Sequence, residues 1–214
     1  MKFANVEIPD GATRIYLIRH GQSIGNLKGL YLGHTDLDLS PEGYEQARRC
    51  ADYLKDESID AFYSSDLIRA YNTALPHAKM RGTSVNAERE LREIFLGEWE
   101  GADLALLKSE QGELFFGGWT DNFGTFTPPG GESVQHLADR IYNEIERIAR
   151  QNPSKGVLIA IHAAAIRSFW GRVMKIAPEK LASALQFPRN ASVSNLYYLD
   201  GEFYPIKYSD DSFM

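Results

Sequence analysis

The sequence predicts an α/β protein whose central sheet is mostly parallel and flanked by helices. Segments with a strand pattern alternate with segments of helical periodicity along the 214 residues. One strand candidate, Gly156–Ile161, is apolar throughout, as expected for a strand buried on both faces. The length fits one domain, or one domain with a substantial insertion. We therefore expect a single domain that spans residues 1–214.

The strand candidates are short and lie between helical segments, except for a closing hairpin at the C-terminal end of the chain. That hairpin turns around Asp200 and Gly201, a residue pair that favours a tight two-residue turn. The strand candidates are Arg14–Ile18, Ile59–Tyr63, Ser84–Ala87 (a weak one), Gly156–Ile161, Ser192–Leu199 and Glu202–Lys207.

Capping residues mark the expected starts of the helices. Ser40 precedes a proline at the first helical position, and Ser133 precedes a long run of apolar residues at helical spacing. Asp66 is in a position to cap a third helix, which Pro76 would end or bend. The segment Ala163–Met174 is also expected to be helical.

Bulk composition excludes several classes of protein. The single cysteine, Cys50, permits no internal disulfide and indicates a reducing compartment. No apolar run approaches the ~20 residues of a membrane span, and the N-terminus lacks the pattern of a secretory leader. A net charge of -6 argues against general nucleic-acid binding, although a local group of cations can still attract an anion. We expect a cytoplasmic protein with no nucleic-acid or membrane partner.

The most informative motif, Arg19–Ser23, follows the first strand candidate. Ligands of α/β proteins usually bind at such strand ends. Arg19 can bind a phosphate through two parallel hydrogen bonds, and the adjacent His20 can act as a nucleophile. Gly21 allows the backbone to turn sharply and to approach an anion. The motif therefore predicts a phosphate site that contains a reactive imidazole.

At this point the chain resembles the histidine phosphatase superfamily, which includes cofactor-dependent phosphoglycerate mutases and related phosphatases. The resemblance extends from about Arg14 to about Leu199 and rests on five separated motifs in one order. They are Arg19–Ser23 with Asn26; Gly33–Asp36 leading to Leu39–Gly43; Ser64–Ala70 with Thr73 and Ala74; Leu91–Glu93 with Gly97–Gly101; and Ile161–His162 before Ile166 and Arg167. The resemblance implies a three-layer, phosphoglycerate mutase-like fold with a cap inserted over the active site at about residues 102–131.

The resemblance also implies roles for five side chains. His20 would be the nucleophile that receives the phosphoryl group. Arg19 and Arg69 would stabilise the negative charge on its equatorial oxygens, and His162 would donate a hydrogen bond to the phosphate. Glu93 would protonate the leaving alcohol and then activate water. To be protonated near neutral pH, Glu93 needs a pKa raised by burial or by a like charge.

Other candidates surround this set. Asn26 matches a phosphate ligand of the family, whereas Gln22 and Ser23 either bind phosphate or only shape the loop. His34 lies in a segment that resembles a substrate-facing loop. The family commonly has glycine after the second histidine, but this chain has Ala163. Because alanine is disfavoured at positive φ, this departure puts the backbone contact with phosphate in doubt, although Ala163 still offers an N–H.

Several titratable residues are not expected to take part in the chemistry. Glu98 and Glu100 are near Glu93 in the sequence but are expected at the surface or behind the site. His77 and His136 lie in helical patterns without a motif around them, so they are interpreted as ordinary helix residues.

The favoured function is a metal-independent phosphomonoester hydrolase that uses a phosphohistidine, needs no cofactor and acts on a small phosphorylated substrate. The main alternative, a phosphoglycerate mutase, would require extra cations in the cap. The segment Ala102–Gly131 has one cation, Lys108, against four acidic residues. Its five bulky aromatic residues instead favour an apolar leaving group or packing within the cap: Phe115, Phe116, Trp119, Phe123 and Phe126.

Two further alternatives belong to other classes. Loss of the family's glycine at Ala163 would fit a phosphate-binding protein with little catalysis. A metallohydrolase could use His20, His162 and Glu93 as ligands, but Arg19 would repel a cation. A homodimer is possible, because small α/β enzymes often dimerise.

Overall fold

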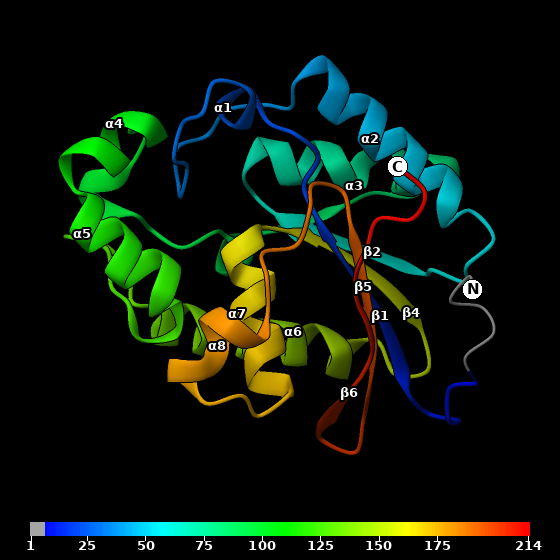
Figure 1. Cartoon of the computed structure of the whole chain (residues 1–214). Coiled ribbons are helices and arrows are strands. Elements are labelled where there is room, and N and C mark those ends of the chain that lie inside the picture. The colour runs from blue at the N-terminus through cyan, green and yellow to red at the C-terminus, as the bar shows by residue number, and fades with distance from the viewer. Residues whose placement is uncertain (1–6) are drawn as a thin grey trace.

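The computed structural model describes residues 7–214, which form a mixed sheet covered by helices on both faces (Figure 1). The six-stranded sheet has the order β3-β2-β4-β1-β5-β6. Strands β1 to β4 run parallel to one another, β5 pairs antiparallel with β1, and β6 pairs antiparallel with β5. The strands are β1 (Thr13–Arg19), β2 (Ala61–Ser65), β3 (Asn86–Glu88), β4 (Gly156–Ile161), β5 (Val193–Leu199) and β6 (Glu202–Asp210). The predicted α/β class is confirmed.

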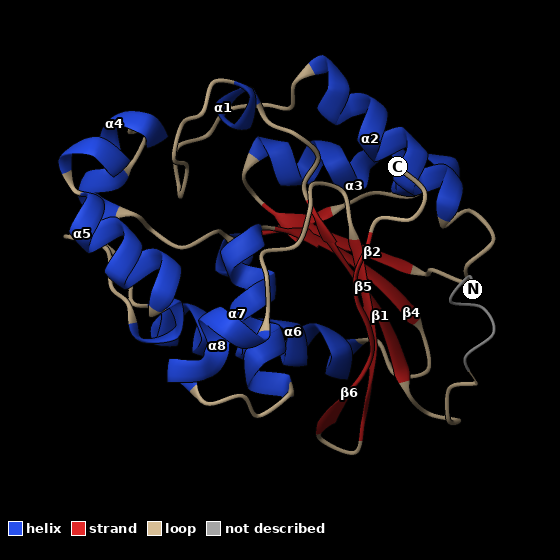
Figure 2. Cartoon of the chain, viewed as in Figure 1, coloured by secondary structure: helices blue, strands red, loops and turns tan. Residues whose placement is uncertain are grey.

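Helices form the outer layers, and Figure 2 shows them on either side of the sheet. Four long helices cover the sheet: α2 (Pro41–Tyr53), α3 (Ile68–Met80), α6 (Val134–Gln151) and α7 (Ala163–Val173). The shorter ones are α1 (Ile24–Leu27), α4 (Leu104–Glu110), α5 (Gly112–Leu114) and α8 (Leu181–Ala184). Ser40 and Ser133 cap α2 and α6 as predicted, since each side chain accepts a backbone N–H of the first turn.

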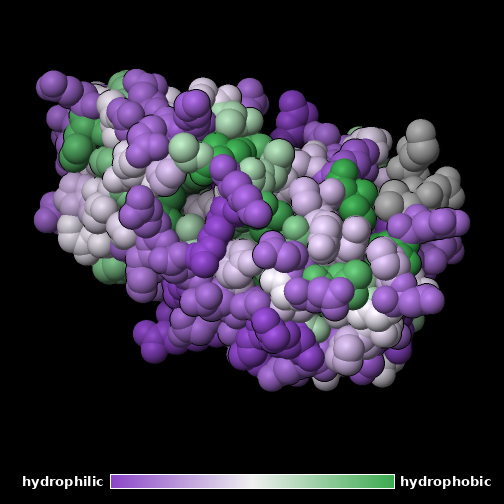
Figure 3. Space-filling view, turned by 90° about the horizontal axis from the view of Figure 1, so that it is seen from below, coloured by the Kyte–Doolittle hydropathy of each residue, from purple (hydrophilic) through white to green (hydrophobic). Residues whose placement is uncertain are grey.

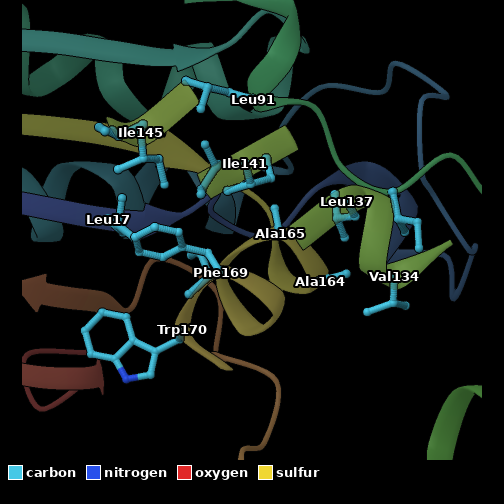
Figure 4. Close-up of a cluster of buried hydrophobic side chains, with 14 of the residues drawn as sticks. Leu17, Leu91, Val134, Leu137, Ile141, Ile145, Ala164, Ala165, Phe169 and Trp170 are labelled. Atoms are coloured by element: carbon cyan, nitrogen blue, oxygen red, sulfur yellow. The ribbon is translucent and has the colours of Figure 1, made fainter. Parts of the chain in front are cut away.

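Alternation along β1 divides the core into two clusters, one on each face of the sheet. Tyr16 and Ile18 pack with side chains of α2 and α3. Ile15 and Leu17 lie on the other face, in the cluster that α6 and α7 complete. Figure 4 shows this second cluster, in which Leu17 lies beside apolar residues of both helices. Because successive strand residues point to opposite faces, one apolar strand supplies both cores.

Three local predictions need correction. β2 begins and ends two residues later than predicted. Asp66 does not cap α3, because its carboxylate accepts two hydrogen bonds from Arg92, each 2.7 Å long. Instead Leu67 is the capping residue of α3, without a side-chain bond. Of the two effects predicted for Pro76, an end or a bend, the end is wrong, because α3 continues to Met80. The favourable carboxylate–guanidinium pair accounts for the different use of Asp66.

The predicted cap region is helical and aromatic. It contains α4 and α5, a π-helix over Phe115–Asp121 and a 3-10 turn over Phe123–Thr125. Figure 2 shows α4 and α5 at the end of the molecule away from β6. Trp119 lies at the centre of this region, with ring centroids 5.1 Å from Phe123 and 5.3 Å from Tyr31. Most of the cap's aromatic residues therefore pack together.

The surface is polar over most of the face shown in Figure 3, and apolar side chains occur there in small groups. In residues 7–214, no helix is both long enough and apolar enough to cross a membrane. The prediction that the N-terminus lacks a secretory leader rests partly on residues 1–6, which lie outside the described residues.

Candidate active site

A cavity of about 180 Å³ lies at the carboxyl ends of β1 and β4. Parallel neighbouring strands end at the same edge, so the segments after them converge there. The predicted residues that line it are Arg19, His20, Ser23, Asn26, Arg69, Glu93 and Ala163. The fold thus brings together most of the predicted site.

His20 is held in one orientation by the backbone. Its Nδ1 lies 2.7 Å from the carbonyl oxygen of Gly21. A carbonyl only accepts hydrogen bonds, so Nδ1 carries the proton and Nε2 keeps a free lone pair. The side chain is 5 % exposed, and burial together with Arg69 and Arg19 holds its pKa well below the ordinary imidazole value. His20 is therefore a neutral imidazole with an available Nε2.

His162 lies beside His20 and follows β4. The two rings meet edge to face, with centroids 5.2 Å apart. Neither ring nitrogen of His162 has a hydrogen-bond partner among the described residues. Burial, Arg69 and His20 hold its pKa well below the ordinary value. His162 is fully buried and is not among the residues that line the cavity, so the structure places it beside His20, behind the cavity wall, with both ring nitrogens unpaired within residues 7–214.

The two arginines bring positive charge to the cavity without a carboxylate partner. Arg69 donates to the carbonyl oxygens of Thr35 (2.9 Å) and Gly33 (2.7 Å), and Arg19 donates to that of Pro188 (2.6 Å). Neither forms an ion pair within the described part of the chain. Burial lowers the pKa of Arg19 to about 10 and lowers that of Arg69 as well. Because arginine keeps its proton in proteins, both guanidiniums are charged at neutral pH. Their charge is directed to an anionic ligand.

Glu93 combines burial with a fixed orientation. Its carboxylate is 7 % exposed and accepts backbone N–H groups of Ile94, Ala164 and Ala165 at 2.9 to 3.1 Å. Burial raises the pKa of Glu93, and the bonds from Ile94 and Ala164 reduce this shift without reversing it. A buried carboxyl of this kind holds a proton at a higher pH than an exposed one. This is the property that a proton donor requires.

Ala163 needs no left-handed backbone. It is the first residue of α7 and is not among the residues with positive φ. The expectation that alanine would strain the backbone at this position is therefore wrong, because a helical φ suits alanine as well as glycine. Ala163 lines the cavity beside the N–H groups that bind Glu93.

The residues after His20 divide between the cavity and the loop. The hydroxyl of Ser23 caps α1 by accepting the backbone N–H of Asn26, and the side-chain Oδ1 of Asn26 accepts the backbone N–H of Ser23. Both line the cavity. Gln22 is not among the lining residues: its Oε1 accepts the hydroxyl of Ser40 at 2.7 Å. This contact favours a role for Gln22 in shaping the loop.

His34 and Glu100 lie behind the site. The Nε2 atom of His34 is 2.9 Å from the backbone oxygen of Glu93, and His34 lines a separate cavity. The carboxylate of Glu100 accepts the backbone N–H groups of Gly33, His34 and Thr35 at 2.7 to 3.3 Å. Since the same loop provides both carbonyls that bind Arg69, Glu100 positions that arginine indirectly.

The rest of the cavity wall is apolar and was only partly anticipated. Trp119 belongs to the aromatic cap, whose composition indicated such a wall. Tyr31 and Phe187 had no motif around them, and only the fold brings them to the cavity. The other apolar side chains of the wall are Leu30, Leu32, Ile94, Leu96 and Ala164.

The donor set does not suit a metal ion. Among residues 7–214, no three His, Cys, Asp or Glu side chains are arranged to hold one. Glu93 is occupied by three backbone donors, and Arg19 and Arg69 line the same cavity as His20. A cation would be repelled at this place.

Comparisons with known proteins agree with this geometry. The sequence model of the histidine phosphatase superfamily (branch 1) matches residues 15–211. Phosphoglycerate mutase-like protein 4 of Arabidopsis thaliana is 32% identical over 198 residues, which cover 90% of this chain and 83% of the relative. A metal-independent phosphoserine phosphatase of the same plant is 30% identical over 210 residues, covering 97% and 86%.

A solved structure is similar over the whole fold. The mycobacterial glucosyl-3-phosphoglycerate phosphatase in complex with VO3 has a TM-score of 0.85 and 26% sequence identity, covering 92% of this chain and 99% of the mycobacterial one. The buried histidine pair, the two arginines and the match over nearly the full chain define a phosphate-handling α/β protein. The chain belongs to the histidine phosphatase superfamily, branch 1.

Proposed function

We propose that this protein is a metal-independent phosphomonoester hydrolase that works through a phosphohistidine on Nε2 of His20. The observation that carries the proposal is the bond between Nδ1 of His20 and the oxygen of Gly21. It fixes the tautomer in which Nε2 is the nucleophile, next to two charged arginines. The family and its phosphatase members support the same reaction class.

The proposed reaction has two steps. Nε2 of His20 forms a bond to phosphorus while the ester P–O bond breaks, and the proton of Glu93 passes to the departing alcohol oxygen. Water then attacks phosphorus, the N–P bond breaks, and the ionised Glu93 takes a proton from that water. The products are an alcohol and inorganic phosphate, and the enzyme is restored. Arg19, Arg69 and His162 would bind the phosphoryl oxygens in both steps.

A mutase is not favoured by the cap. A mutase must bind a second anionic group and return the phosphoryl group before water does. Lys108 is not among the lining residues of the cavity; its Nζ lies 5.6 Å from the centroid of the Phe115 ring. No cation other than Arg19 and Arg69 lines the cavity in the described part of the chain. The hydrolase is therefore the better-supported function.

The test is hydrolysis of p-nitrophenyl phosphate in the presence of a chelator, for the wild type and for His20→Ala. We expect turnover by the wild type and its loss in the variant. His136→Ala is the matched control, because this histidine is exposed and lies outside the cavity. Loss of turnover in chelator would contradict metal independence. No hydrolysis of any ester, with phosphate binding retained, would support the binding-protein alternative.

A further inference from the structure

The cavity wall carries both charged and apolar side chains. Arg19, Arg69 and Glu93 provide the charges, and the proposed reaction uses all three. The lining rings of Trp119 and Phe187 stack with centroids 5.8 Å apart, so they form one continuous aromatic wall. Because the charged groups match the phosphoryl group of a substrate, its alcohol is left to contact this wall.

The cation Arg167 packs against this wall but does not line the cavity. The guanidinium carbon of Arg167 lies 4.2 Å from the ring centroid of Phe187 and 4.5 Å from that of Phe123. Its NH2 group donates to the carbonyl oxygen of Ala182 at 2.8 Å. Arg167 is buried and does not line the cavity, whereas Phe187 does. The cation thus supports an aromatic wall without offering its charge to a ligand.

Tyr31 provides a single polar group in this part of the wall. Its hydroxyl is buried and has no hydrogen-bond partner among the described residues. Its ring is fixed by edge contacts with Trp99, Phe115 and Trp119 at 5.3 to 6.2 Å. Tyr31 therefore adds ring surface and no charge to this wall.

We infer that the substrate is the phosphate monoester of a compact, uncharged, largely apolar alcohol. The inference rests on the proposed function and adds the class of its leaving group. A cavity of about 180 Å³ is small beside the ~300–1,000 Å³ typical of sites for drug-sized ligands, so the part of the alcohol that lies inside it is compact. A substrate such as O-phosphoserine would place an ammonium and a carboxylate against apolar side chains, which is unfavourable without partners. The chain would then differ in substrate from the relative that is named a metal-independent phosphoserine phosphatase.

The test compares kcat/KM for benzyl phosphate, O-phosphoserine and 3-phosphoglycerate. All three are esters of primary alcohols, so differences in leaving-group chemistry are small. We expect benzyl phosphate to be preferred by about tenfold or more, because the other two esters would leave charges unpaired against the aromatic wall. Equal or better hydrolysis of O-phosphoserine or 3-phosphoglycerate would overturn the inference and leave the hydrolase intact. His20-independent turnover, or no turnover of any ester, would overturn both.

Two variants examine the wall directly. Phe187→Ala is expected to lower kcat/KM for benzyl phosphate by about tenfold, mainly through KM, and to affect O-phosphoserine less. Phe116→Ala is the matched control, since this cap residue is exposed and outside the cavity. Leu30→Lys would add a cation to the wall, so the ratio of kcat/KM for 3-phosphoglycerate to that for benzyl phosphate is expected to rise. A parallel loss for all three esters in Phe187→Ala, together with an unchanged ratio in Leu30→Lys, would contradict the apolar subsite.

Discussion

Burial shifts the pKa values of His20 and Glu93 in opposite directions. Loss of solvent disfavours the charged form of any group, so it lowers the pKa of the imidazole and raises that of the carboxyl. Both side chains are driven towards their neutral forms. A neutral imidazole is the nucleophile and a neutral carboxyl is the acid, so one physical cause prepares both groups for the proposed first step.

Glu93→Gln is expected to slow the hydrolysis of alkyl phosphates by about 10²–10⁴-fold, because the amide cannot protonate the alcohol. The loss should be much smaller for p-nitrophenyl phosphate, whose leaving group needs little protonation. Steady-state kcat/KM for both esters measures the difference. Equal losses for the two leaving groups would argue against Glu93 as the proton donor.

The pH dependence of benzyl phosphate hydrolysis follows from the same shifts. As pH rises through the raised pKa of Glu93, the carboxyl loses the proton it must donate, and kcat/KM is expected to fall. Protonation of His20 limits the rate only at a pH well below the ordinary imidazole pKa. The kcat/KM–pH profiles of wild type and Glu93→Gln should therefore differ on the alkaline side. Identical alkaline limbs would assign that limb to another group, such as the substrate phosphate.

At the scale of elements, the Gly33–Thr35 loop connects two parts of the site. Its carbonyl oxygens accept hydrogen bonds from the guanidinium of Arg69, and its backbone N–H groups donate to the carboxylate of Glu100. The carboxylate also accepts the hydroxyl of Thr35 at 2.7 Å and the N–H of Leu96 at 3.1 Å. These bonds hold the pKa of Glu100 below its ordinary value, although burial opposes them. One carboxylate thus fixes a loop on which a phosphate-binding arginine depends.

Glu100→Gln is expected to lower the free energy of unfolding by about 1–3 kcal/mol, because an amide NH2 would face N–H donors. Activity should fall as well, since the carbonyls that orient Arg69 would shift. Denaturant unfolding and kcat/KM measure the two effects. Because the folded pKa of Glu100 is depressed, its contribution is present above the ordinary carboxyl pKa and is lost as pH falls through the folded value. Glu98→Gln, at an exposed neighbour, should change neither quantity.

Ala163→Gly tests the start of α7. Since the position is helical, we expect activity within about twofold of wild type and a stability loss of no more than ~1 kcal/mol from the added backbone freedom. Phosphatase kinetics and denaturant unfolding would measure both. A large gain in activity would show that the family's glycine provides a backbone geometry that alanine prevents.

At the scale of the molecule, the site depends on a sheet that is buried on both faces. Strands β1 and β4 lie side by side at its centre, and a histidine follows each of them at its carboxyl end. α6 and α7 cover one face with the cluster of Figure 4. The geometry of the candidate site thus depends on the most deeply buried strands of the sheet.

Ile145→Ala in α6 is expected to destabilise the protein by about 2–5 kcal/mol, because it leaves a cavity in this fully buried cluster. Activity per folded molecule should be retained, since Ile145 does not line the active-site cavity. Denaturant unfolding with parallel kinetics would show both. Leu106→Ala, at an exposed position in α4, should change stability by less than about 0.5 kcal/mol.

Local features of the sequence predicted the elements well and their ends less well. Ser40 and Ser133 act as caps, because capping involves residues within one turn. Asp66 has the same capping chemistry, but a distant residue, Arg92, takes its carboxylate. Capping was therefore predictable only where no long-range partner competes for the side chain.

The α/β class and the group of polar residues at the carboxyl ends of two strands could be predicted from local patterns. This was possible because strand periodicity is local and parallel strands end at one edge. Only the folded chain reveals the proton position on His20, the negative φ of Ala163 and the support of the Arg69 loop by Glu100. The same holds for the place of Tyr31 and Phe187 in the cavity wall. These properties depend on burial and on contacts between segments far apart in the chain, which no local pattern encodes.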